Sequence, residues 1–358
     1  MLMKILTIVG ARPQFVKAAV VSKALAAYPR LKEVMLHTGQ HFDANMSSIF
    51  FDQLLIPRPS HLLDIHGGSH GEMTGRMMIE VERVMQAEKP DRVLVYGDTN
   101  STLAGALVAT KLHVPVAHVE AGLRSFDRRM PEEINRILTD QVSDLLFCPT
   151  DTAIQNLSNE GFGSKPVSML KVGDVMQDSA LLFSSHAIKP AGIKIAGPFV
   201  LATLHRAENT DDSKRLGALI EGLNAIHRDT APVVLPLHPR TRAAIDRLGQ
   251  RLVVITIDPV GYLEMLWLLQ HCGLVLTDSG GVQKEAYFFE KMCVTMRDTT
   301  EWTELVELGA NSLVGASSEA ISAAASVNFG RKVDTEASVY GGGKAANRIA
   351  SVIAGDGA

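Results

Sequence analysis

The stretch Ile5-Leu6-Thr7-Ile8-Val9-Gly10-Ala11-Arg12-Pro13-Gln14 combines an apolar β-branched run with a tight loop. Pro13 suits the first turn of a following helix, and helical periodicity continues from Gln14 to Ala27. The run from Ile5 to Val9 is apolar throughout and does not alternate, which is typical of a parallel strand covered on both faces by helices. The stretch therefore predicts a β-strand that leads through a loop into a crossover helix.

The alternation of strand and helix continues through the first half of the chain. Helical periodicity is clear from Gly71 to Ala87. Short apolar runs predict further strands at Val34 to His37, Arg92 to Tyr96, Val114 to Val119 and Leu145 to Cys148. We expect residues 1–172 to form a doubly wound, Rossmann-like α/β domain.

The same pattern starts again after Val172-Gly173-Asp174. A chain of 358 residues also exceeds the usual size of a single core, which favours two domains. The strands expected in the second half are Phe199 to Thr203, Val233 to Leu237, Val253 to Ile257, Leu274 to Thr277, Val294 to Met296 and Ser312 to Val314. The segment from Ala187 to Pro198 looks like a loop near the join. Two Rossmann-like domains facing a central cleft would bind a ligand at the carboxyl ends of their strands.

Composition argues against several classes of partner and cofactor. The formal net charge of -4 gives no general reason to expect nucleic acid or an anionic membrane as partner. Because no uncharged run reaches about 20 apolar residues, we expect no membrane span and a cytoplasmic protein. Cys148, Cys272 and Cys293 are widely spaced and odd in number, so we interpret them as packing residues and expect no metal site.

Two loops that follow strands have the features of anion sites. The loop Gly10 to Gln14 should offer free backbone amides beside Arg12 and Lys17, although an ordinary turn with a solvated arginine is the plainer interpretation. The motif Ser279-Gly280-Gly281 begins a predicted helix, where two glycines let a phosphate approach the backbone and the helix dipole favours its charge. Glu285, about two turns along, is placed to reach the hydroxyls of a ribose.

Carboxylates gather on the loops that close the first predicted sheet. Asp98 and Glu120 each follow a strand, and Glu132 with Glu133 stands at a probable helix start behind Pro131. Loops that end on one sheet edge can converge, which is how general acid and base pairs are assembled. The alternatives are that Glu133 only favours the helix dipole and that Asp98 or Glu120 only caps a helix.

Histidine stands near arginine after two strands of the second half. His205-Arg206 and His238-Pro239-Arg240 place an imidazole and a guanidinium where a diphosphate or a proton transfer could use them. A lone histidine in such a place is more often a structural hydrogen-bonding residue. His41 and Asp43, after the second strand, are weaker candidates for contact with sugar or phosphate, and Gln40 beside them is an expected substrate contact.

A nicotinamide cofactor is not expected. Gly341-Gly342-Gly343-Lys344-Ala345-Ala346 has the spacing of the dinucleotide fingerprint, but no βαβ unit follows it in this sequence, so we interpret the match as accidental. The first loop and Gly97-Asp98-Thr99 lack the fingerprint, and no P-loop is present. The sequence therefore gives no sign of a bound cofactor.

Together these residues resemble the non-hydrolysing UDP-N-acetylglucosamine 2-epimerase family, which includes UDP-2,3-diacetamido-2,3-dideoxy-glucuronate 2-epimerases. The likeness extends over nearly the whole chain. The matching blocks are Gly10-Ala11-Arg12-Pro13, Gly39-Gln40-His41, Tyr96-Gly97-Asp98-Thr99, His118-Val119-Glu120-Ala121-Gly122-Leu123-Arg124, Pro131-Glu132-Glu133-Ile134-Asn135-Arg136, Asp278-Ser279-Gly280-Gly281, Met296-Arg297-Asp298-Thr299-Thr300-Glu301 and Tyr340-Gly341-Gly342-Gly343.

The resemblance implies a glycosyltransferase B fold, in which residues 341–358 return to the first domain and residues 173–340 form the UDP-binding domain. It implies a homodimer that interconverts UDP-N-acetylglucosamine and UDP-N-acetylmannosamine without redox cofactor or metal, for bacterial surface polysaccharide precursors. The implied route is anti elimination of UDP to a 2-acetamidoglucal, followed by re-addition of UDP.

The resemblance also assigns roles to residues by their position in the motifs. The implied catalytic residues are Asp98, Glu120, Glu132 and His205. The residues implied to hold UDP are Arg12, Lys17, Ser279, Gly280, Gly281 and Glu285. Gln40, His41, Arg206 and His238 stay expected substrate contacts from their places after strands.

Two departures from the family pattern bear on the sugar. The family often has arginine where this chain has Ala207, and Arg-Pro-Glu where Glu301 is followed by Trp302-Thr303-Glu304. The nearest alternative substrate is therefore UDP-2,3-diacetamido-2,3-dideoxy-glucuronate, whose added groups demand a roomier pocket and an extra cation.

Two other classes of function stay open at this point. A glycosyltransferase of the same fold would need an acceptor and would show no interconversion of sugars without one. A silent nucleotide-sugar binder would bind UDP-sugar without exchange of the C2 proton, but the retained Asp98, Glu120, Glu132 and His205 argue against it.

Overall fold

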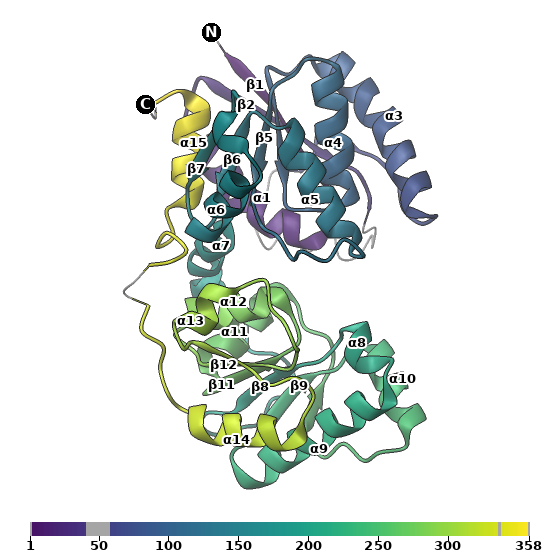
Figure 1. The fold of residues 1–358 in the computed structure, drawn as a ribbon, viewed down its shortest axis with the longest axis vertical. Coiled ribbons are helices and arrows are strands. Elements are labelled where there is room, and N and C mark those ends of the chain that lie inside the picture. Colours follow the sequence, from purple (N-terminus) through teal and green to yellow (C-terminus); the bar gives the residue numbers. More distant parts are fainter. Residues whose placement is uncertain (1, 41–57, 336–337, 357–358) are drawn as a thin grey trace. The chain divides into compact units, whose positions relative to one another are not determined.

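The computed structural model describes residues 2–40, 58–335 and 338–356. These residues belong to two compact units, which are treated separately below (Figure 1). The first unit runs up to Leu182 and takes in the segment from Ser338 onward. The second unit is Phe183–Ala337.

The first unit is built on a parallel sheet with strand order β3-β2-β1-β4-β5-β6-β7. Its strands are β1 (Met3–Val9), β2 (Leu31–His37), β3 (His61–Leu62), β4 (Arg92–Tyr96), β5 (Val116–Val119), β6 (Leu145–Cys148) and β7 (Ser168–Lys171). The order reverses between β1 and β4, and this reversal is the point at which doubly wound sheets bind ligands beyond their carboxyl ends.

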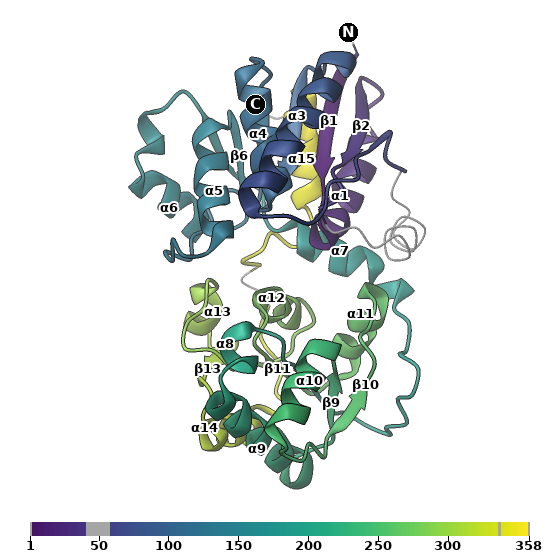
Figure 2. The same cartoon turned by 90° about the vertical axis from the view of Figure 1, so that its right-hand side faces the viewer.

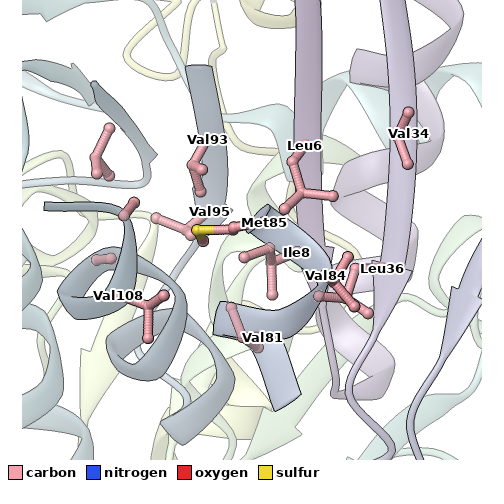
Figure 3. Packing of buried hydrophobic residues seen from close by; sticks show 13 residues of the cluster. Leu6, Ile8, Val34, Leu36, Val81, Val84, Met85, Val93, Val95 and Val108 are labelled. Atoms are coloured by element: carbon pink, nitrogen blue, oxygen red, sulfur yellow. The ribbon is translucent and has the colours of Figure 1, made fainter. Parts of the chain in front are cut away.

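Helices cover both faces of this sheet. They are α1 (Arg12–Leu25), α3 (His70–Glu88), α4 (Asn100–Lys111), α5 (Pro131–Val142), α6 (Asp151–Asn159), α7 (Val175–Phe183) and α15 (Ala345–Ala354). Apolar side chains of β1, β2 and β4 pack against α3 and α4 in one buried cluster (Figure 3). α1 packs against α15 (Figure 2).

The second unit repeats the same topology with order β10-β9-β8-β11-β12-β13, again entirely parallel. Its strands are β8 (Val200–Thr203), β9 (Val233–Pro236), β10 (Ile255–Ile257), β11 (Leu274–Thr277), β12 (Cys293–Thr295) and β13 (Asn311–Leu313). Its helices are α8 (Ala207–Thr210), α9 (Ser213–Asp229), α10 (Pro239–Leu248), α11 (Tyr262–His271), α12 (Gly280–Phe288), α13 (Thr303–Glu307) and α14 (Ser318–Asn328). The short 3-10 helices are Phe162–Ser164 in the first unit and Ser184–His186 in the second.

The expected α/β class with two Rossmann-like, doubly wound sheets is confirmed. Every strand expected from the sequence is present, with ends that differ by at most three residues. The sequence did not predict β3 and β7, the two edge strands of the first sheet. β3 contains only His61–Leu62, and no residue of β7 is fully buried, so neither has the apolar run of an inner strand.

Helix α7 and the C-terminal segment are held together within the first unit. Ser179 Oγ donates to the carbonyl of Val16 on α1, and the Asp178 carboxylate accepts the first two amides of α15, from Ala345 and Ala346, at 3.2 and 2.8 Å. These bonds place the end of the first unit after Leu182. The partition expected from the sequence lies before α7, at residues 172–173, and returns at residue 341.

The glycine-rich segment Gly341-Gly342-Gly343 forms the turn that leads into α15. All three glycines have positive φ, and Gln177 Oε1 accepts the amides of Gly342 and Gly343. A side chain on Gly173 would lie 2.6 Å from the carbonyl oxygen of Tyr340, so two backbone segments meet where only glycine fits. The resemblance to a dinucleotide fingerprint thus has a structural explanation.

The three cysteines are buried and free, as packing residues should be. Burial raises the pKa of Cys272 and of Cys293 to about 12. Across the described ranges, no helix is long and apolar enough to cross a membrane.

The Asp178 cap should matter for stability, because it satisfies two buried amides of α15. We expect Asp178→Ala to lower the free energy of unfolding by about 1–3 kcal/mol, the usual cost of leaving buried groups unpaired. Urea denaturation measures the change. Asp246→Ala, at an exposed position of α10, is the control and should change stability by less than about 0.5 kcal/mol. A loss for Asp178→Ala no larger than the control's would contradict the capping role.

Candidate active site

The chain has positive φ just after β4 and just after β5. Gly97, after β4, has φ of 61°, and Glu120, directly after β5, has φ of 75°. Positive φ is uncommon for residues other than glycine and is found preferentially at functional sites. Asp98 and Glu120, both expected to be catalytic, therefore lie at the sheet edge where the topology predicts ligand binding.

Asp98 forms an ion pair with Arg136 of α5. The same guanidinium also donates to Glu133 Oε2 at 3.0 Å. Burial alone would lower the pKa of Arg136, but the charges of Asp98, Glu133 and Glu120 outweigh it and raise that pKa. Arg136 is therefore a fixed cation among three carboxylates.

Glu120 forms an ion pair with Lys17 of α1. The two side chains are nearly buried, at 9% and 11% exposed. A side chain on Gly97 would lie 3.3 Å from Glu120 Oε2 and 3.6 Å from Lys17 Nζ, so the Gly97-Asp98 loop passes directly beside this pair. Lys17 was expected to hold UDP, but in the structure it pairs with Glu120, which is a candidate catalytic residue.

Glu132 and Glu133 differ sharply in environment, although both begin α5. Glu133 is buried and accepts the amides of Ser125 and Phe126, each at 2.9 Å, so it shapes the preceding loop. Glu132 is exposed and has no hydrogen-bond or ion-pair partner within the described residues. Glu132 is therefore the carboxylate of this helix that remains available to a ligand.

The first loop was expected to offer free backbone amides to an anion. That expectation is wrong for Gly10 and Ala11, whose amides already donate hydrogen bonds within the protein. Gln14 Oε1 accepts the amides of Gly10 and Ala11 at 2.7 and 3.0 Å, and Gln14 Nε2 donates to the carbonyl of Tyr96 at 2.7 Å. The buried Gln14 thus ties the loop after β1 to the end of β4. The Arg12 side chain lies outside what the structure describes, so its assignment to UDP stays a prediction.

Gln40 also has an internal partner. Its Oε1 accepts the amide and the hydroxyl of Ser101, at 3.0 and 2.7 Å, in the first turn of α4. Gln40 therefore links the loop after β2 to the helix after β4, close to Asp98 in sequence. His41 and Asp43 lie outside the described residues, and their expected roles stay predictions.

In the second unit, Asp278 organises the loop that carries His205 and Arg206. Its carboxylate is fully buried at the end of β11 and accepts the amides of His205 and Arg206, the latter at 2.9 Å. His205 Nδ1 lies 3.2 Å from Asp278 Oδ1, and half of the imidazole stays exposed. Burial would raise the pKa of Asp278, but these hydrogen bonds and the charge of His205 lower it below the usual value.

The start of α12 is partly taken by an internal anion. A side chain on Gly280 would lie 2.0 Å from Glu301 Oε1, so this carboxylate contacts the helix N-terminus. Arg297 donates to Glu301 at 2.9 Å, and Arg206 approaches it at 4.0 Å. Burial opposes ionisation of Glu301, but the charges of Arg297 and Arg206 lower its pKa.

The remaining residues expected at the second site fall into two groups. Gly281 is exposed with nothing within 4 Å of an added side chain, and Ser279 is half-buried beside it, so this part of the first turn of α12 is open. Glu285 is buried one turn further on. His238 caps α10 by accepting the amide of Arg240 at 3.3 Å, which is the structural role that the sequence had left open.

The structure thus brings Lys17, Glu120, Asp98 and Arg136 together in the first unit and His205, Arg206 and Ser279 around Asp278 in the second. The sequence assigned no role to Arg136 or Asp278. Asp278 could have been found by its place directly after a buried strand, the same place that singled out Glu120. Arg136 gives no such signal, because it lies within a helix. Within the described residues, no group of histidine, cysteine and carboxylate side chains is placed to hold a metal ion.

The pKa of Asp278 makes a prediction about stability. Since the folded pKa lies below the usual 3.8, the ionised carboxylate stabilises the fold above that pH and ceases to do so as the pH falls through the folded value. Asp278→Asn should lower the free energy of unfolding by about 1–3 kcal/mol at pH 7, and the difference should shrink as the pH falls below 3.8 and through the folded pKa. Urea unfolding at several pH values tests this, with Asp258→Asn on an exposed loop as control. A deficit independent of pH would contradict it.

Comparison with known sequences places the chain in a family. The sequence profile described as UDP-N-acetylglucosamine 2-epimerase matches residues 23–354. A UDP-2,3-diacetamido-2,3-dideoxy-D-glucuronate 2-epimerase of Pseudomonas aeruginosa is 66% identical over 352 residues, covering 98% of this chain and 99% of that protein. A UDP-N-acetylglucosamine 2-epimerase of Methanocaldococcus jannaschii is 43% identical, with 98% and 99% covered.

Solved structures agree with the sequence comparison. The crystal structure of the Methanocaldococcus jannaschii UDP-GlcNAc 2-epimerase in complex with UDP-GlcNAc and UDP superposes with a TM-score of 0.86 at 42% identity and covers 99% of both chains. That of Neisseria meningitidis UDP-GlcNAc 2-epimerase bound to UDP-GlcNAc gives 0.84 at 30% identity, covering 98% of this chain and 99% of that one. With the profile matched across nearly its full length, the chain belongs to the UDP-N-acetylglucosamine 2-epimerase family.

Proposed function

We propose that this protein epimerises UDP-2,3-diacetamido-2,3-dideoxy-D-glucuronate at C2 of the sugar. The reaction type is supported by two carboxylates at the edge of the first sheet. Asp98 is paired with Arg136, and Glu120 is paired with Lys17. The choice of sugar rests on the 66% identity to an enzyme that bears this name. UDP-N-acetylglucosamine, the substrate placed first from the sequence, becomes the second candidate.

The proposed reaction requires two proton-handling groups and a strong hold on the diphosphate. A base takes the C2 proton, the electrons of the C2–H bond form a C1=C2 double bond, and UDP leaves from C1 with the C1–O electron pair. UDP then adds back at C1 while C2 receives a proton on its other face. Because the C2 proton is only weakly acidic, stabilising the leaving diphosphate is as important as the base.

The residues of the first unit fit the proton-handling part of this scheme. Ion pairs with Arg136 and Lys17 fix the directions of the Asp98 and Glu120 carboxylates before substrate binds. Glu132 is exposed one turn before Arg136 and adds a third carboxylate for positive charge that develops at C1. The assignment of base and acid between Asp98 and Glu120 is left to experiment.

The residues of the second unit fit the diphosphate part. His205 is half exposed, and the helix start at Ser279 and Gly281 is open to an anion. Among the residues that the structure describes, the ion-pair partner of Arg206 is Glu301 at 4.0 Å, so most of the hydrogen-bonding capacity of Arg206 is available to a phosphate. Arg12 and Glu285 complete the proposed UDP contacts.

Two local departures from the family pattern lie near the residues already described in the second unit. Ala207 and Trp302 replace arginines that the family often has, and both lie beside residues already described, at the start of α8 and directly after Glu301. Trp302 is buried, and Lys284 Nζ lies 4.0 Å from the centre of its ring. Because both changes remove a cation, they do not supply the extra positive charge expected for a uronate, and the choice of sugar rests on the sequence identity. A cytoplasmic homodimer serving surface polysaccharide synthesis stays part of the proposal.

Proton NMR in deuterium oxide tests both the reaction and the sugar. We expect the purified protein to exchange the C2 proton of the diacetamido uronate and to produce the manno isomer, with at least about 100-fold slower exchange of UDP-N-acetylglucosamine. Preferred exchange of UDP-N-acetylglucosamine would restore it as the substrate. Absence of exchange with both sugar nucleotides would overturn the proposed epimerase activity and favour a glycosyltransferase. The next assay would then be sugar transfer to an added acceptor.

The role of Asp98 makes a separate prediction. Asp98→Asn keeps the shape of the side chain but removes its ability to take a proton, so turnover should fall by at least about 100-fold. The affinity for UDP, measured by calorimetry, should stay within a few fold because the proposed UDP contacts are unchanged. Asp151→Asn is a matched control, since Asp151 is an exposed aspartate of the same unit paired with Lys171. Normal turnover of Asp98→Asn would remove Asp98 from the mechanism.

A further inference from the structure

A chain of mostly buried ionisable residues lies beneath the loops of the first unit that carry Asp98 and Glu120. We call it the His118 network, and its members are His118, Asp140, Arg124 and Glu160. His118 on β5 and Asp140 on α5 have no exposed surface, and Arg124 is almost fully buried. Only Glu160, at the end of α6, reaches solvent, with 31% of its side chain exposed. None of these residues has a place in the proposed chemistry.

The His118 ring connects α5 to the loop that carries Asp98. Its Nε2 lies 2.7 Å from the carbonyl oxygen of Gly97, and its Nδ1 lies 2.7 Å from Asp140 Oδ1. A backbone carbonyl can only accept a hydrogen bond, so Nε2 must carry a proton. The Gly97 carbonyl belongs to the peptide group that joins Gly97 to Asp98. This hydrogen bond therefore holds the backbone immediately before the Cα atom of Asp98.

Asp140 reaches the loop that carries Glu120 with its other oxygen. Asp140 Oδ2 accepts the amide of Gly122, two residues after Glu120, at 3.1 Å. The same oxygen accepts a hydrogen bond from Arg124 Nη1 at 2.7 Å. One buried carboxylate therefore fixes the His118 ring and the backbone that follows Glu120 at the same time.

Arg124 neutralises this buried carboxylate and anchors the network at its far end. Its Nε and Nη2 donate to the two oxygens of Glu160, at 2.7 and 2.8 Å. Burial would lower the pKa of Arg124, but the hydrogen bonds and charges of Glu160 and Asp140 raise it. Such a fully paired network inside a core is rigid, since no member can move without leaving a charge unpaired.

We propose that His118 is a positioning residue for the epimerase reaction. Through Nε2 it sets the orientation of the Gly97–Asp98 peptide and hence of the Asp98 carboxylate, while Asp140 orients the imidazole. The inference rests on the proposed function for the meaning of Asp98, but the geometry that it predicts can be observed without turnover. Rate depends steeply on such placement, because a displacement of about 1 Å at a reacting group can cost about 100-fold.

Two substitutions at residue 118 separate positioning from stability. The amide nitrogen of asparagine falls near the place of Nδ1, and that of glutamine, one carbon longer, falls near the place of Nε2. His118→Gln therefore keeps a donor for the Gly97 carbonyl but loses the hydrogen-bond partner that Nδ1 provides for Asp140. His118→Asn keeps the donor for Asp140 and loses the one for Gly97.

We expect kcat of His118→Asn to fall about 100-fold and kcat of His118→Gln to fall less than about 10-fold, with KM changed little in both. Thermal unfolding should rank the variants the other way, since glutamine leaves the buried Asp140 Oδ1 without the partner that His118 Nδ1 provides. Ile226→Ala, a core substitution in α9 of the second unit, is the control for general destabilisation and should keep its kcat below its melting temperature. Equal losses of kcat in the two variants, or losses that follow thermal stability, would overturn the proposal.

A crystal structure of His118→Asn gives a readout that is independent of activity. We expect the Gly97–Asp98 peptide to rotate and the Asp98 carboxylate to move relative to Arg136, with Glu133 and α5 in place. An unmoved Asp98 carboxylate would refute the positioning role. Lack of turnover by the unaltered protein would instead refute the proposed function and leave the structural comparison to decide the role of His118.

Discussion

All strands of both sheets run parallel, and this constraint decides where chemistry can occur. Parallel strands deliver their last residues to one edge, so the loops after β1, β2, β4 and β5 meet although long stretches of chain separate them. Gln14 shows how firmly they meet, since its amide group joins the loop after β1 to the end of β4. The covering helices then add the charged partners, such as Lys17 from α1 and Arg136 from α5.

Charges in this environment are held in pairs because an isolated buried charge is very unfavourable. At the edge of the first sheet, each of the two proposed catalytic carboxylates has a cation beside it. Beneath them, the His118 network continues the alternation of acid and base down to the surface at Glu160. The result is a set of carboxylates whose directions are fixed by the fold before a substrate arrives, which lowers the cost of ordering them during the reaction.

The second unit uses the same topology for a different electrostatic task. Asp278, at the end of β11, accepts the amides of His205 and Arg206 in the loop after β8 and leaves half of the His205 imidazole exposed. In the proposed function, the part of the α12 start at Ser279 and Gly281 that Glu301 leaves open binds an anion, and the loops of the first unit carry out proton transfer. The difference between the two units would then follow from which charged residues stand at equivalent strand ends.

The sequence by itself determined the alternation of strand and helix, the presence of two doubly wound sheets and the loops that bear Asp98, Glu120, His205 and Ser279. These features are local, because periodicity and the residue after a strand can be recognised within about ten positions. Tertiary structure alone decided the partners. Lys17 pairs with Glu120, 103 positions away, and Gln14 occupies amides that the sequence left free for a phosphate. Such contacts depend on how helices cross the sheet, and no local pattern encodes that geometry.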